Sequence, residues 1–152
     1  MLKPTVITWI LVIFGVVFIF LPIVITQTMM AMNPDSQKTK DIIIGKGEDW
    51  RDRTHLRSSY GIALADLIFW VPLLVAGSIG VMLGRVWGYV LWGSAGAIFV
   101  YISIFLLLSE REYVYPAVGP LLYYTVIWGF FLYWGVAAIA YATLRLSNVK
   151  LS

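Results

Sequence analysis

The chain has 152 residues, of which 61% are hydrophobic and 12% are charged, and its formal net charge is +3. Soluble domains contain roughly 45–50% apolar and about 25% charged residues, and a soluble fold of this size could not bury so much apolar surface. The composition therefore predicts an integral membrane protein. The sequence has no cysteine and one histidine, which excludes thiolate chemistry and a multi-histidine metal site within one chain. We interpret the basic balance as polar segments beside lipid, with no nucleic-acid partner.

Four charge-free windows locate the membrane-spanning helices. They hold 31, 18, 24 and 32 residues, and a spanning helix needs about 20 apolar residues. The windows predict helices over residues 5–27, 60–83, 87–109 and 118–144. The connections between the last three helices are short, so we expect neighbouring helices to be antiparallel. The predicted fold is all-α, a single membrane domain over residues 1–152 built as an antiparallel four-helix bundle.

Two prolines interrupt the first two predicted helices. The first helix follows Lys3 and is too long for the apolar part of a signal peptide, so we expect it to stay as an anchor. Pro22 and Pro72 each remove a backbone hydrogen bond and should kink their helices. Such kinks are hinges in some transport proteins and plain bends in most membrane helices, and we expect bends. Asn33 and Pro34 should end the first helix.

Residues 33–58 form one polar loop between the first two helices, and most of the charged side chains lie there. Asp49 is expected to cap a helix that starts at Trp50, with Asp52 completing a weak capping box. If that helix continues into the second spanning helix, one helical face carries the following residues: His55, Ser59, Ile62 and Asp66. A break near residues 58–61 is the equal alternative.

Asp66 is the most conspicuous residue because it lies within an apolar run. If the membrane begins at Tyr60, Asp66 lies about 9 Å below its surface, from a rise of about 1.5 Å per residue. A carboxylate at that depth usually marks a proton, ion or ligand site. Alternatively, residues 67–84 span about 27 Å alone. Asp66 would then lie at the headgroup level, paired with Arg57 or with water.

The candidate functional cluster lies on one predicted side of the membrane. It consists of Asp66, His55, Arg57, Glu110 and Glu112. Carboxylates and imidazole are ligands that divalent cations accept. No ligand spacing brings these residues together, however, so we predict neither a metal nor a cofactor.

Small and aromatic residues provide the other candidate sites. Five glycines are expected to mediate helix packing, at least partly within the chain: Gly77, Gly80, Gly84, Gly88 and Gly96. Four deep aromatic residues are candidates for a pocket that holds a lipid, quinone or pigment: Trp70, Trp92, Tyr101 and Trp128. A tightly packed core between helices is the commoner explanation for such residues.

These patterns predict a small membrane protein without catalysis of its own. It would act as an interaction subunit, in a homo-oligomer or with another membrane protein, surrounded by membrane lipid. The alternative is a small ion- or proton-coupled transporter or channel that uses Asp66. A third hypothesis is a lipid-acting enzyme with acid/base residues in the polar cluster, although no nucleophile stands beside a positioned base.

The distribution of basic residues predicts the orientation. One side carries four basic residues and no acidic one: Lys3, Arg85, Arg145 and Lys150. The positive-inside bias then places both termini in the cytoplasm. We expect a plasma or inner membrane.

Overall fold

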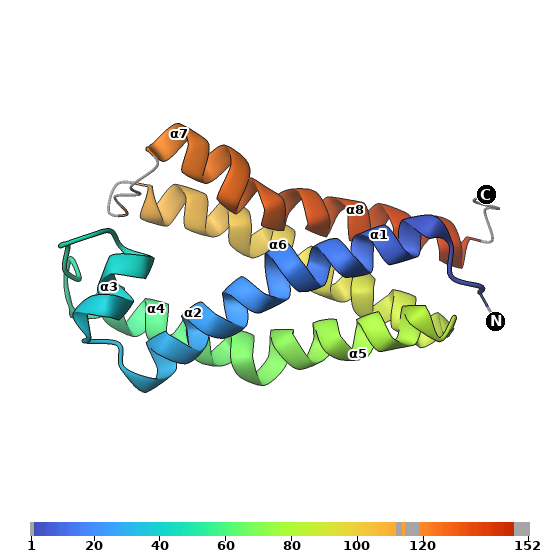
Figure 1. Cartoon of the computed structure of the whole chain (residues 1–152), viewed down its shortest axis with the longest axis horizontal. Helices are drawn as coiled ribbons and strands as arrows, with labels where there is room; N and C mark the ends of the chain where they lie inside the picture. Colours follow the sequence, from blue (N-terminus) through green and yellow to red (C-terminus); the bar gives the residue numbers. More distant parts are fainter. Residues whose placement is uncertain (1, 112–113, 115–118, 148–152) are drawn as a thin grey trace.

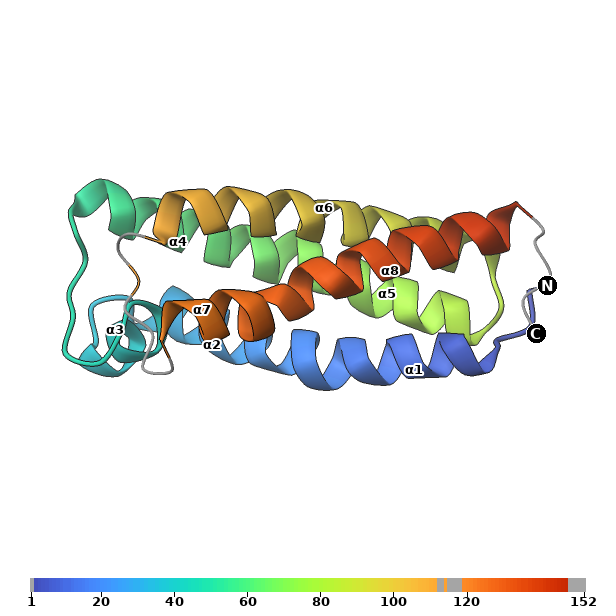
Figure 2. The ribbon, with the colours of Figure 1, turned by 90° about the horizontal axis from the view of Figure 1, so that it is seen from above.

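The computed structural model describes residues 2–111, 114 and 119–147, and all regular secondary structure in that part of the chain is helical. Four helices are long and apolar enough to cross a membrane, and we call them spans 1 to 4. They are Val6–Met32, Arg53–Met82, Val86–Glu110 and Tyr123–Leu146. All four lie along the long axis of the molecule (Figure 1, Figure 2). The prediction of an all-helical chain with four apolar helices is confirmed, and it fits a multi-pass membrane protein.

Three of the four spans are composite. Span 1 joins α1 (Val6–Phe14), the π-helical segment η1 (Gly15–Phe20) and α2 (Leu21–Met32). Span 2 joins α4 (Arg53–Ala65), the π-helical segment η2 (Asp66–Trp70) and α5 (Val71–Met82). Span 3 is the single helix α6 (Val86–Glu110). Span 4 joins the π-helical segment η3 (Tyr123–Ile127) and α8 (Trp128–Leu146), and the short α7 (Pro120–Leu122) precedes it. Helix α3 (Gln37–Ile43) lies between spans 1 and 2.

The two prolines expected to kink spans 1 and 2 lie just after two of the π-helical segments. Pro22 and Pro72 are the second residues of α2 and α5, which follow η1 and η2. A proline lacks the N–H group and its ring clashes with the carbonyl four residues earlier. A π-helical turn contains an extra residue, which relieves this crowding. The predicted kinks therefore take the form of widened turns.

Span 2 begins earlier than the prediction. Its helix starts at Arg53 rather than at residue 60 and is unbroken through residues 58–61. The polar segment between spans 1 and 2 is therefore 33–52 rather than 33–58. Span 1 ends at Met32 rather than at residue 27. The polar residues at the ends of spans 1 and 2 did not end these helices, because a helix can continue beyond the hydrocarbon core of a membrane into water.

Asp52 caps span 2, so the prediction of Asp49 as the cap is wrong. The backbone of Asp52 is extended, and its carboxylate accepts hydrogen bonds from the N–H groups of Thr54 at 2.7 Å and His55 at 2.9 Å. Asp49 instead forms an ion pair with Lys40, whose Nζ lies 2.8 Å from its Oδ1. An aspartate caps the helix only where its carboxylate faces the free amides of the first turn.

Paired glycines bring span 3 against its two neighbours. A Cβ atom added at Gly80 would lie 2.5 Å from the Cα atom of Gly88, where α5 meets α6. A Cβ atom added at Gly96 would lie 2.7 Å from the carbonyl oxygen of Gly135, where α6 meets α8. Both contacts join backbone to backbone, which only glycine permits.

The deep tryptophans find their partners inside the chain. Trp70 donates its indole N–H to the carbonyl oxygen of Ala95, Trp92 donates to the hydroxyl of Ser78, and Trp134 donates to the carbonyl oxygen of Leu11. All three tryptophans are buried. Their polar tips are therefore satisfied within the core.

The end of the molecule opposite α3 is closed by the turn at Gly84. This glycine has φ +64°, and its carbonyl oxygen accepts a hydrogen bond from the N–H of Leu2 at 2.9 Å. The Arg145 guanidinium donates to the carbonyl oxygen of Lys3 at the same end, where α1 begins and α8 finishes (Figure 1). Gly84 thus serves a turn, and the partner of Gly80 is Gly88.

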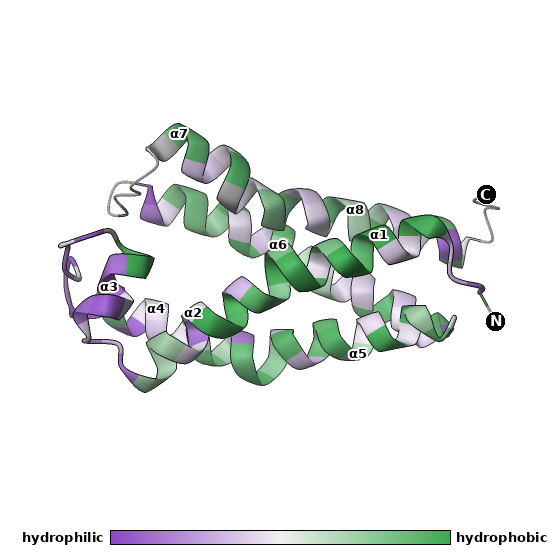
Figure 3. Cartoon of the chain, viewed as in Figure 1, coloured by the Kyte–Doolittle hydropathy of each residue, from purple (hydrophilic) through white to green (hydrophobic). Residues whose placement is uncertain are grey.

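Hydropathy divides the molecule along its length. Apolar residues cover the four spans, and hydrophilic residues gather mainly at the α3 end (Figure 3). Large apolar side chains such as Ile68 and Leu108 are exposed along the spans. Surfaces of this kind suit contact with lipid.

Candidate functional site

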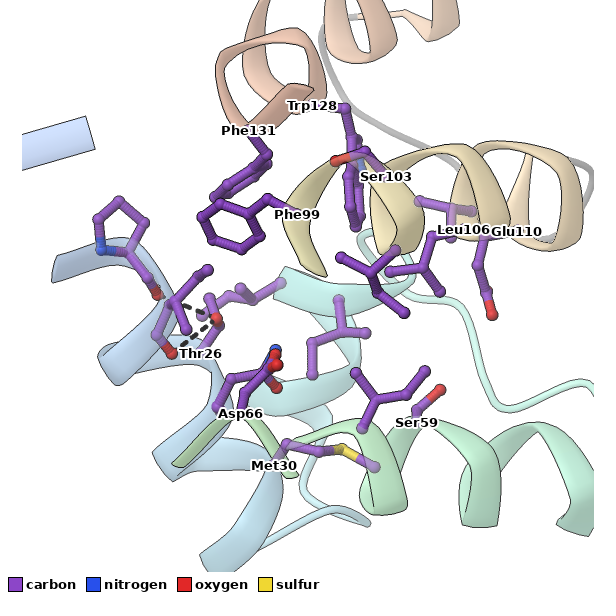
Figure 4. A pocket seen from close by; sticks show the side chains of 18 of the residues that line it. Thr26, Met30, Ser59, Asp66, Phe99, Ser103, Leu106, Glu110, Trp128 and Phe131 are labelled. Atoms are coloured by element: carbon purple, nitrogen blue, oxygen red, sulfur yellow. Dashed lines mark hydrogen bonds between the residues drawn. The ribbon is translucent and has the colours of Figure 1, made fainter. Parts of the chain in front are cut away.

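A cavity of about 310 Å³ lies between the spans toward the α3 end (Figure 4). All four spans line it, and α3 adds Ile42 and Ile43. Most of the lining is apolar. The side chains with polar groups include Thr26, Gln27, Ser59, Asp66, Ser103 and Glu110. Pockets that bind small molecules have this composition, with a few polar groups in an apolar wall.

Asp66 lines this cavity as the first residue of η2. Its carboxylate accepts a hydrogen bond from the side-chain amide of Gln27 in α2, with 2.9 Å between Nε2 and Oδ2. Arg57 is exposed, and among the described residues no ion pair joins it to Asp66. The carboxylate thus has a neutral partner, and the alternative in which Arg57 neutralises it finds no support.

Ser103 contributes a buried hydroxyl to the cavity. Its side chain lies on α6 and is 6% exposed. Among the described residues its hydroxyl has no hydrogen-bond partner. A buried polar group without a partner is costly, so a water or ligand in the cavity would stabilise this hydroxyl.

Glu110 at the end of α6 is held by His55 at the start of span 2. The Nε2 atom of His55 lies 2.9 Å from Oε2 of Glu110. The N–H of Arg51 donates to Nδ1 of the same ring at 3.4 Å, so Nε2 carries the proton and donates to the carboxylate. His55 is buried and Glu110 lines the cavity. The pair ties span 2 to span 3 at the rim.

The predicted polar cluster is therefore divided. Asp66 and Glu110 line the cavity, His55 supports Glu110, and Arg57 faces outward. Glu112 lies outside the described residues. In the part of the chain that the structure describes, no group of three or more histidine, aspartate or glutamate side chains could hold a metal ion.

The four predicted pocket aromatics occupy three different environments. Trp128 lines the cavity. Trp70 and Trp92 belong to the packed core instead, and Tyr101 is 70% exposed on the outside of α6. The aromatic wall of the cavity is completed by Phe99, Phe131 and Tyr123.

Sequence reasoning missed Gln27 and Ser103. Gln27 is the only amide side chain between Lys3 and Met32, which is a usable signal in an apolar helix. Ser103 has no such signal. A serine in an apolar helix can also bond its own helix backbone, as Ser94 does, and the sequence does not distinguish the two cases.

The chain matches no known family model, and neither a curated protein nor a solved structure is significantly similar to it.

Proposed function

We propose that the chain is a membrane transporter that binds a small solute at Asp66. In this proposal its four spans form an antiparallel bundle with one polar loop between spans 1 and 2. The protein lies in a plasma or inner membrane, and both termini are cytoplasmic. The observation that carries the proposal is the position of Asp66 in the cavity, where its one hydrogen-bond partner among the described residues is a neutral amide.

A carboxylate within a membrane-spanning segment costs free energy, and such groups usually mark ion, proton or ligand sites. The cavity provides the space that a bound solute needs. The same carboxylate can hold either a proton or a cationic group. Competition between the two at one site couples solute movement to proton movement.

The walls of the cavity contain the irregular parts of the bundle. Asp66 begins η2, Tyr123 begins η3, and Pro22 follows η1. π-helical turns are frequent at functional sites, and they are places where a helix changes direction. Widened turns in three walls give the spans places to bend, which alternating access requires.

A test follows from the absence of cysteine, because single-cysteine variants need no background substitution. Ser103→Cys is reconstituted in sealed vesicles of known orientation and exposed to a charged, membrane-impermeant thiol reagent from either side. A transporter site must be reached from both sides, so we expect labelling from each. Labelling from one side only would show a binding pocket without transport, and no labelling would remove the cavity from function.

Ser94→Cys is the matched control. Ser94 lies on the same helix, and its side chain is exposed on the outer surface of the bundle. A charged reagent does not enter lipid, so this variant should stay unlabelled from both sides.

The interaction-subunit hypothesis remains as a second candidate, favoured by one residue. Several of the small and aromatic residues behind it contact other parts of the same chain, as described above for Gly80, Gly88, Gly96, Trp70 and Trp92. Tyr101, however, is 70% exposed and lies near the middle of α6. A phenol hydroxyl gains little from lipid tails. A second copy packed on this face of α6 would give it a partner.

The mass of the protein in mild detergent tests this candidate. A particle with more than 17.1 kDa of protein is expected if copies associate through Tyr101. Tyr101→Leu should then reduce the mass to that of one chain. A strict monomer in detergent and in nanodiscs would reject the association.

A further inference from the structure

The lining of the cavity selects for one sign of charge. It contains two carboxylates, Asp66 and Glu110, and among the described residues no lysine, arginine or histidine lines it. Glu110 is engaged by the imidazole of His55, whereas Asp66 receives a hydrogen bond from a neutral amide. In a mostly apolar wall the charge of Asp66 is weakly screened. The cavity therefore repels anions and attracts a cation.

The walls of the cavity opposite Asp66 are aromatic. Phe99 and Phe131 lie with ring centroids 5.4 Å apart, Trp128 lies 5.5 Å from Phe131, and Tyr123 lies 6.3 Å from Trp128. These four rings come from α6, α8 and η3 and form a connected surface. Figure 4 shows three of them, Phe99, Trp128 and Phe131. Aromatic faces attract organic cations, and they also pack against apolar bodies.

Size and the free hydroxyl narrow the ligand further. A volume of about 310 Å³ is in the range of pockets for small organic molecules, well beyond what a bare metal ion needs. Among the described residues the hydroxyl of buried Ser103 has no partner, so it can accept a hydrogen bond from a ligand that carries an N–H donor. Two carboxylates on separate spans, one of them engaged, do not form a coordination shell for a hydrated inorganic cation.

We propose that the substrate is an amphipathic organic cation, a small apolar or aromatic molecule that carries one protonated amine or quaternary ammonium group. The positive group lies at Asp66 and the apolar body lies against the aromatic wall formed by Phe99, Tyr123, Trp128 and Phe131. This assignment rests on the proposed function, since it names the solute of the same cavity.

A binding experiment with an isosteric pair tests the charge requirement. The full chain in nanodiscs is titrated with radiolabelled benzyltrimethylammonium, and its neutral carbon isostere neopentylbenzene is used as a competitor. We expect saturable binding of the cation, at least tenfold weaker competition by the isostere, and no competition by benzenesulfonate. Equal competition by the neutral isostere would overturn the assignment of a cation.

Variants of Asp66 and Ser94 locate the binding. Asp66→Asn keeps the size of the side chain and an acceptor for Gln27, so the fold should survive, and affinity for the cation should fall at least tenfold. Asp66→Glu retains the charge and should retain binding. Ser94→Ala, on the outer face of α6, should bind as the wild type does. Unchanged affinity in Asp66→Asn would overturn the proposal.

A second measurement does not depend on the shape of the probe. Ser103→Cys is treated with two methanethiosulfonates, one with a trimethylammonium group and one with a sulfonate. The ratio of their rates is divided by the ratio for free mercaptoethanol. We expect the normalised ratio of the trimethylammonium rate to the sulfonate rate to exceed ten, and to fall toward one when Asp66→Asn is added. A normalised ratio near one in Ser103→Cys alone would contradict a cation-selective cavity.

The two proposals fail in different ways. If Ser103→Cys is labelled from both sides but neither cation test is positive, transport stands and the substrate class is wrong. If Ser103→Cys is labelled from one side only while the cation binds through Asp66, the ligand is correct and transport is wrong.

Discussion

At the residue scale, the hydrogen bond between Gln27 and Asp66 joins spans 1 and 2 beside the cavity. Gln27→Leu leaves the carboxylate without this donor, and we expect the free energy of unfolding to fall by about 1–3 kcal/mol. Unfolding in mixed detergent micelles measures the change. In the double variant with Asp66→Leu the two losses should not add, because the second substitution removes the unsatisfied group. Strict additivity would show that the bond contributes nothing.

Asp52 gives the start of span 2 a dependence on pH. Hydrogen bonds from the His55 N–H, the Arg51 side chain and the Thr54 N–H hold the pKa of Asp52 below its usual 3.8. The lowered pKa means that the charged cap stabilises the fold above pH 3.8, and this stabilisation is lost as the pH falls through the lowered value.

Asp52→Asn isolates this effect, because asparagine is an equally good cap that does not titrate. We expect the melting temperature of the wild type to fall more steeply than that of Asp52→Asn as the pH drops below about 4. Other carboxylates titrate in both proteins, so the difference between the two curves reports Asp52. Parallel curves from pH 7 to pH 2 would mean that the cap is not charged when it acts.

At the element scale, helix packing depends on where the glycines lack space. In Gly80→Ala the new Cβ would meet the backbone of Gly88 at 2.5 Å, so α5 and α6 must separate. We expect a loss of about 1–3 kcal/mol in the free energy of unfolding, as for other overpacked sites. Denaturation in mixed micelles provides the measurement.

Gly61→Ala is the matched control in span 2. A Cβ atom at Gly61 meets nothing within 4 Å. Alanine lowers the entropic cost of the helix, so this variant should gain about 0.5–1 kcal/mol. Similar losses in both variants would indicate that the contact between Gly80 and Gly88 is not what joins the two helices.

At the scale of the whole molecule, the orientation stays a prediction that amine labelling can test. Lys38 and Lys46 lie in the segment between spans 1 and 2 and are exposed, whereas Lys40 is paired with Asp49. With both termini in the cytoplasm, a membrane-impermeant amine reagent should modify Lys38 and Lys46 in intact cells. Lys40 should react more slowly. Modification only after lysis would reverse the orientation.

The prediction of four apolar spans succeeded because hydropathy and charge act locally along the chain. The helix ends were less predictable, since Arg53 to Ser59 is polar and still helical. The choice of Asp52 over Asp49 as the cap depends on backbone conformation, which neither residue type reveals. Similarly, Gly80 meets the backbone of Gly88 on the other side of the turn, whereas the positive φ of Gly84 serves the turn itself.

The sequence by itself determined the class of protein, the number of apolar helices, the absence of thiol chemistry and the presence of a carboxylate in span 2. Only the tertiary structure decided what that carboxylate meets. Gln27 lies 39 positions before Asp66, and His55 lies 55 positions before Glu110. Such pairings depend on how far each helix is rotated and shifted against its neighbours, and backbone contacts at Gly80, Gly88, Gly96 and Gly135 set that register. In α5 and α6 apolar residues lie on every side of the helix, so hydropathy does not record how these two helices are rotated, and the cavity could emerge only from the packed bundle.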